Sequence, residues 1–162
     1  MNVYVLLSHL HSVNRWLVLA FVLWAIGAAF ARRGTMNVAD VGAVLPKGAL
    51  PAFIVTHVQL LLGLILYFAA VAGLPNVGSP YVIMDKFAWE AEGGEILRFY
   101  SVTHFSWMLA AVVLITVGYM VAKRASTSAK AAFWILLTYG IALVLMLINI
   151  PWPGRGLGGG WY

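Results

Sequence analysis

The chain alternates between long apolar runs and shorter segments rich in polar residues, glycine and proline. Four runs hold the roughly 20 mostly apolar residues that crossing a bilayer requires, at about 10–31, 50–74, 99–122 and 131–150. The last two runs are separated only by a short polar segment, "KRASTSAK". Because short connections join antiparallel neighbours, we predict one all-α domain over residues 1–162, an up-down-up-down bundle of four transmembrane helices.

Composition supports a membrane location and narrows the chemistry. Of the 162 residues, 63% are hydrophobic and 9% are charged, against roughly a quarter charged in soluble domains. The absence of cysteine excludes disulfides, thiolate-bound iron–sulfur clusters and covalently attached c-type haem. The sequence has no phosphate-binding glycine loop and no nucleophile elbow. Any redox cofactor must therefore be held without a covalent bond.

The positions of the charges predict the topology. Basic residues lie between the first and second runs and between the third and fourth, whereas the segment between the second and third is acidic. The residues are Arg32, Arg33 and Lys47, then Lys123, Arg124 and Lys130, and in the acidic segment Asp85, Glu90, Glu92 and Glu95. By the positive-inside rule the basic loops are cytoplasmic and both termini lie outside, N-out/C-out. The net charge of +5 thus indicates a lipid bilayer as partner and no nucleic acid.

Three histidines lie inside the predicted runs. The tripeptide "VTH" occurs at 55–57 and at 102–104, each time with its histidine about two helical turns inside a run, near opposite membrane faces. His11 lies near the outer end of the first run, within about one turn of the depth of His104. Because the first and third helices are diagonal in such a bundle, we predict that His11 and His104 face each other across its core. His9 is rotated by about 200° from His11 and is assigned to the outer surface, although an exchange of their roles is left open.

Small and cationic residues accompany this pair. Arg15 lies one turn from His11 on the same face, and Arg98 lies near the outer end of the third run. Since arginine binds carboxylates through two parallel hydrogen bonds, both are candidates to pair with outward-pointing haem propionates. The alternative is that each arginine anchors its helix at the lipid headgroups. Small residues that follow the two histidines on the same faces either leave room for a cofactor or let helices approach closely: Ala25, Ala29, Ala111 and Gly118.

His57 has no histidine partner at its own depth. The one soft candidate ligand on that side, Met120, lies nearer the membrane surface. With Thr56 and Gln59 nearby, His57 could bind a second haem, contact a quinone head group, accept protons, or form hydrogen bonds between helices. The residues alone do not choose among these roles.

Four segments together resemble a known family. "HSVNRWLVL", "THVQLLLGLILYF", "RFYSVTHFSWMLAAVVLITVGY" and "IPWPGRGLGGGW" are similar to small four-helix bacterial membrane proteins labelled cytochrome b, and more distantly to di-haem b-type cytochromes that exchange electrons with quinones. The resemblance covers nearly the whole chain except the acidic segment. It implies a multi-pass protein of the bacterial inner membrane with non-covalent haem b, ligated by His11 and His104 and, for a second haem, His57. Two bis-histidine sites need four such histidines, so the second haem stays open.

These observations predict an electron-transfer protein of the respiratory chain. The hypothesis is a b-type cytochrome carrying electrons between quinone or a membrane redox partner and an acceptor, with haem bound near the outer side. Quinone-linked oxidoreductase activity and oligomer formation are left open. The alternative is a haem-free accessory subunit of a larger respiratory or transport complex. A metal or proton transporter is disfavoured because no aspartate or glutamate lies inside a predicted run.

Overall fold

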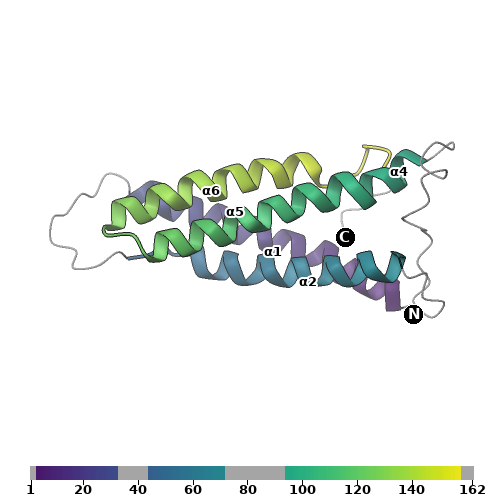
Figure 1. The fold of residues 1–162 in the computed structure, drawn as a ribbon, viewed down its shortest axis with the longest axis horizontal. Helices are drawn as coiled ribbons and strands as arrows, with labels where there is room; N and C mark the ends of the chain where they lie inside the picture. The colour runs from purple at the N-terminus through teal and green to yellow at the C-terminus, as the bar shows by residue number, and fades with distance from the viewer. Residues whose placement is uncertain (1–2, 33–43, 72–93, 158–162) are drawn as a thin grey trace.

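The protein is described by a computed structural model over residues 3–32, 44–71 and 94–157. Within these ranges it contains helices and no strand (Figure 1): α1 (Val3–Arg32), α2 (Ala49–Val71), α4 (Gly94–Arg98), the π-helical turn η1 (Phe99–His104), α5 (Phe105–Lys123) and α6 (Ser128–Asn149). Since α4, η1 and α5 follow one another without a gap, they form one long helix. Four helices are long and apolar enough to cross a membrane. The predicted all-α fold is therefore confirmed, and the chain is a multi-pass membrane protein.

The helix ends differ from the predicted runs mainly on one side of the bundle. The sequence predicts a first span from residue 10, but α1 begins at Val3 and includes the polar stretch "SHLHS". The third span likewise begins at Gly94 rather than at residue 99. A hydropathy pattern marks the length in contact with lipid, whereas a helix continues for as long as its backbone hydrogen bonds are satisfied. The end of the second run, 72–74, lies outside the described residues.

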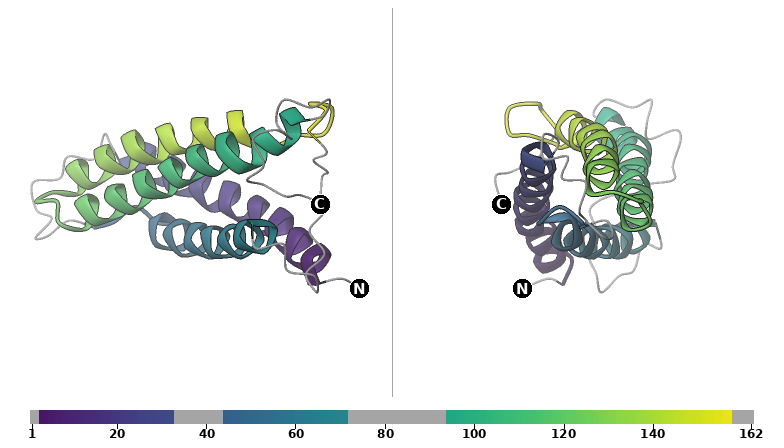
Figure 2. Two further views of the ribbon diagram at one scale, coloured as in Figure 1. Left: turned by 45° about the vertical axis from the view of Figure 1, so that its right-hand side comes forward. Right: turned by 90° about the vertical axis from the view of Figure 1, so that its left-hand side faces the viewer.

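The four long helices form an antiparallel ring. In the view along the bundle (Figure 2), α1 contacts α2 and α6, and α5 contacts the same two helices from the other side. The diagonal placement of the first and third spans is thus as predicted. The interface between α2 and α5 is the smallest of the four. The pair α1/α2 diverges from the pair α5/α6 toward the end at which α1 begins (Figure 2).

Small residues close the other half of the bundle. A Cβ added to Gly118 of α5 would overlap the hydroxyl of Thr138 on α6, so this glycine sets how closely the two helices approach. Gly48 has φ +89°, and a Cβ there would lie 2.8 Å from the backbone nitrogen of Ala25 on α1. The small residues that follow the two histidines are all buried, at Ala25, Ala29, Ala111 and Gly118. None of these four lines the cavity described below, and their burial is consistent with close packing of the helices.

Two prolines end α6. In an α-helix each carbonyl accepts a hydrogen bond from the N–H four residues later, but Pro151 and Pro153 have no N–H to give to Leu147 and Asn149. Ile150, which precedes Pro151, is extended with φ −70° and ψ 131°. The helix therefore stops at Asn149, with carbonyl groups that need other donors.

Candidate functional site

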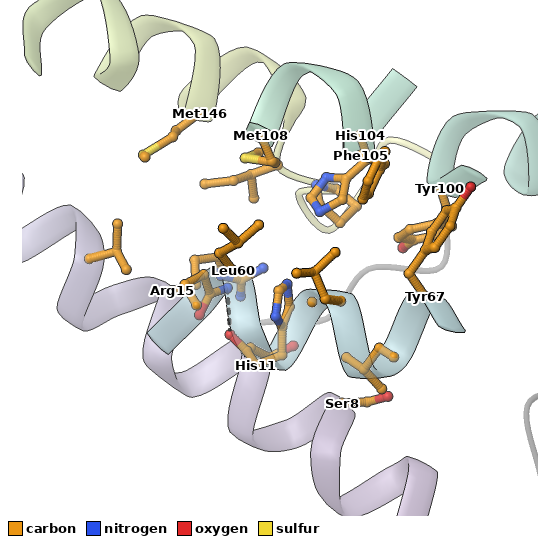
Figure 3. Close-up of a pocket in the computed structure, with 18 of the residues that line it drawn as sticks. Ser8, His11, Arg15, Leu60, Tyr67, Tyr100, His104, Phe105, Met108 and Met146 are labelled. Atoms are coloured by element: carbon orange, nitrogen blue, oxygen red, sulfur yellow. Dashed lines mark hydrogen bonds between the residues drawn. The ribbon is translucent and has the colours of Figure 1, made fainter. Parts of the chain in front are cut away.

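A cavity of about 460 Å³ lies in the diverging half of the bundle (Figure 3). Residues from α1, α2, α4, η1, α5 and the end of α6 line it, and most of them are apolar. No acidic residue of the described chain is among them. Ligand pockets in proteins typically measure about 300–1,000 Å³ and combine an apolar lining with a few placed polar groups. The polar groups here include His11, Arg15 and His104.

His11 and His104 point toward each other across this cavity (Figure 3). Their ring centroids are 6.5 Å apart, with an angle of 68° between the ring planes. Two imidazole–metal bonds of about 2.0–2.1 Å, with each ring centre about 1.2 Å beyond its nitrogen, would place two rings about 6.4 Å apart around one ion. The structure thus brings together the two histidines that the sequence pairs, at a separation that suits two ligands of one metal ion.

A hydrogen bond behind the ring of His104 fixes which of its nitrogens faces the cavity. Its Nδ1 lies 2.8 Å from the backbone carbonyl of Asn149. Because a carbonyl only accepts, Nδ1 must carry the proton and donate it, which leaves Nε2 with a lone pair. Metal-binding histidines usually hold their second ring nitrogen in this way.

A π-helical turn carries His104. It extends over Phe99–His104 inside an otherwise α-helical span, and the rings of Phe99 and Tyr100 lie 5.8 and 6.0 Å from the imidazole, centroid to centroid. Such turns are rare and occur frequently at functional sites, since one extra residue rotates the side chains before it relative to those after it. Sequence reasoning missed this turn, because its residues satisfy an α-helical pattern equally well.

His11 is held from α2. A Cβ added to Gly63 would lie 3.1 Å from Cε1 of the imidazole, so the glycine leaves room for the ring. Gln59 donates to the His11 backbone carbonyl at 3.0 Å, and Asn14 donates to the Gln59 side-chain oxygen at 2.8 Å. Nδ1 of His11 is buried and makes no hydrogen bond within the described residues. The sequence analysis did not identify Gly63 or Asn14.

The two predicted arginines lie in different surroundings. Arg15 is 8% exposed and lines the cavity. Its guanidinium carbon lies 5.3 Å from the ring centroid of Trp16 and 5.8 Å from that of Trp152, within cation–π range. Arg98 is exposed and does not line the cavity, so only Arg15 accompanies the histidine pair. His9 is exposed, as expected, although it also contributes to the cavity wall.

His57 lies outside the cavity. Its Nδ1 is 2.7 Å from the carbonyl of Phe53 on its own helix, and its Nε2 is 3.3 Å from the Thr116 hydroxyl on α5. The Thr116 hydroxyl itself donates to the Val112 carbonyl at 2.7 Å. His57 therefore contacts its own helix and a neighbouring one, as in the last of the roles considered for this residue, and its part in a second haem stays a prediction. Met120 is exposed, and Thr56 lines the cavity with a buried hydroxyl that makes no hydrogen bond in the described part of the chain.

The site has to be interpreted from its own geometry. Comparison with protein-family models, with curated proteins and with solved structures finds no match for this chain. Among the described residues, no three histidine or carboxylate side chains gather as a metal site would require. The cavity therefore offers two opposed imidazoles, one buried guanidinium and an apolar wall.

Proposed function

We propose that this protein is a b-type cytochrome of the bacterial inner membrane that holds one haem b between His11 and His104. The observation that carries the proposal is the pair of imidazoles 6.5 Å apart, one of them fixed from behind by a backbone carbonyl. A haem brings four nitrogen ligands of its own, so two histidines would be enough to complete the coordination of its iron. A bare metal ion would need further side chains, which the described residues do not supply.

The rest of the cavity suits the same ligand. Its apolar wall would bury the macrocycle, and Arg15 would pair with a propionate through its guanidinium. Because Arg98 is exposed, this proposal rests on Arg15 alone. The charge pattern predicts that the cavity lies in the outer half of the membrane.

Electron transfer is the activity that such a site supports. When bound, the haem supplies one-electron redox chemistry. His11 and His104 would bind the iron and so keep other ligands from it, while the apolar wall would exclude water. The electron partner is either a quinone, reached through the bilayer, or a membrane redox protein, reached through the bilayer or at the outer surface.

The rival proposal, a haem-free accessory subunit, draws on His57. That ring shows that a histidine inside this bundle can be satisfied by helix hydrogen bonds without a cofactor. In the rival, His11 and His104 would only link helices. Nδ1 of His11 makes no such bond within the described structure, so the link between helices that the rival requires of this ring is not seen there.

The test is a visible spectrum of the purified full-length protein in detergent, as isolated and after addition of haemin. We expect a low-spin, reducible b-type spectrum with one haem per chain, and its loss in His11→Ala. A wild-type protein that retains no haem under either condition would overturn the cytochrome and leave the accessory subunit.

A further inference from the structure

At the end of α6, three consecutive carbonyls accept no hydrogen bond from a helical N–H. Pro151 and Pro153 cannot donate, and the N–H of Trp152 turns to the carbonyl of Ile150 at 2.9 Å. Side chains replace the missing donors. Leu147 accepts from Nε1 of Trp152 at 2.8 Å, Ile148 from Nη1 of Arg155 at 2.6 Å, and Asn149 from Nδ1 of His104 at 2.8 Å.

One of these three donors differs from the others in origin. Trp152 and Arg155 belong to the segment that follows α6 and satisfy carbonyls only a few residues away. His104 comes from the neighbouring span, 45 residues earlier in the chain. The carbonyl of Asn149 therefore connects the helix end to the candidate site, and it is available because Pro151 and Pro153 do not let the helix continue.

We propose that Pro151 and Pro153 together are positioning residues for His104. By ending α6 and withholding an N–H, they leave the Asn149 carbonyl to accept from Nδ1, which fixes the tautomer that has Nε2 bare and open to the cavity. The inference rests on the proposed function only for the identity of the ligand that Nε2 binds. The tautomer of His104 does not depend on that function. A carbonyl behind a ligating imidazole raises its basicity, which favours the oxidised iron and lowers the reduction potential.

Pro151 acts together with Pro153. An N–H at residue 153 can reach Asn149 in helical fashion only if residues 150–152 are helical, and a proline at 151 disfavours that conformation at Ile150. In Pro153→Ala, Pro151 still ends the helix. In Pro151→Ala, the helix can lengthen, but residue 153 still has no donor. Each single substitution should therefore leave the Asn149 carbonyl to accept from His104. The double substitution lets α6 continue, so that the N–H of residue 153 can donate to the Asn149 carbonyl in its place.

The first experiment needs no haem. The full chain, labelled with ¹⁵N-histidine, is placed in lipid nanodiscs at alkaline pH, where imidazoles are neutral, and the His104 signals are assigned by their loss in His104→Ala. We expect the Nδ1–H tautomer in the wild type and in both single variants, and its loss in Pro151→Ala/Pro153→Ala. An Nε2–H tautomer in the wild type would overturn the inference, and so would a folded double variant that keeps the wild-type tautomer.

The second experiment joins the inference to the proposed function. In haem-loaded protein, the reduction potential should rise in the double variant and stay at the wild-type value in each single variant. Arg155→Lys is the matched control, because it changes the donor to the Ile148 carbonyl in the same segment while the charge and both prolines remain. An equal rise in Arg155→Lys would mean that general loosening of the segment is responsible, and would overturn the inference. Failure of the wild type to bind haem would instead overturn the proposed function and leave the tautomer result standing.

Discussion

The two "VTH" tripeptides each place a histidine about two turns inside a span, but the two histidines lie in different chemical surroundings. His57 bonds the carbonyl of Phe53, one turn back on its own helix, and the hydroxyl of Thr116. His104 instead bonds Asn149 on α6 and faces His11 across a cavity. Because the motif is the same, the difference comes from the neighbouring helices. A carbonyl at the end of α6 accepts a hydrogen bond from one ring nitrogen of His104, and the other nitrogen faces the cavity.

The first prediction separates these two histidines by haem content. His104→Ala should lower the haem bound per protein by about tenfold or more, because losing only a hydrogen-bond partner of a metal ligand typically lowers the affinity about 10–100-fold. His57→Ala should bind haem as the wild type does, because its ring lies outside the cavity. The measurement is the haem-to-protein ratio from visible spectra. Equal losses in the two variants would mean that the motifs do not differ in role.

The second prediction concerns the closely packed half of the bundle. Gly118→Ala puts a methyl group against Thr138 and should destabilise the protein by about 1–3 kcal/mol, the usual cost of overpacking. Gly140→Ala is the matched control, since a Cβ at Gly140 meets nothing within 4 Å, and it should be neutral or stabilising by up to about 1 kcal/mol. Unfolding in mixed micelles, followed by circular dichroism, measures both. A tolerated alanine at 118 would contradict the close approach of α5 and α6.

The third prediction separates the two arginines. Arg15→Gln removes a positive charge beside the proposed haem, so the oxidised and more positive state loses a repulsion and the reduction potential should fall. At an effective dielectric of about 20 and a separation of about 8 Å, the upper limit is about 2 kcal/mol. Arg98→Gln should leave the potential unchanged, because Arg98 is exposed and outside the cavity. Redox titration decides, and a fall in Arg98→Gln without one in Arg15→Gln would reverse the assignment.

The smallest effect is expected at the partner of His57. Thr116→Val removes the hydroxyl that lies 3.3 Å from the imidazole, and interhelical hydrogen bonds in membranes contribute on average about 0.6 kcal/mol. Stability should fall by that order, with haem content unchanged. A loss of haem in this variant would show that the two halves of the bundle are coupled.

Much of the fold follows from the sequence because its physical causes are local. Apolar runs give the spans, short connections give antiparallel neighbours, and depth along a diagonal pair brings His11 to His104. The separate positions of Arg15 and Arg98 do not follow, since both lie near a span end in sequence. Which of them enters the cavity depends on helix rotation, and η1 changes that rotation within the third span.

The partners of the two histidines were also beyond the sequence analysis. Gly63 matters because a Cβ would touch His11, a contact between α1 and α2 that depends on their exact approach. The carbonyl of Asn149 has no side-chain signature at all. Its signal is the proline four residues later, which can be found only by asking which carbonyls of a helix end lack a donor.

The position of that carbonyl also orders the assembly of the protein. His11 and His104 belong to the first and third spans, but Asn149 ends the fourth, so a growing chain with three helices in the membrane holds both imidazoles and not the acceptor that directs one of them. The contact that fixes the His104 tautomer therefore forms only after α6 has inserted. The end of the last helix thus completes a site whose two histidines come from the first and third spans.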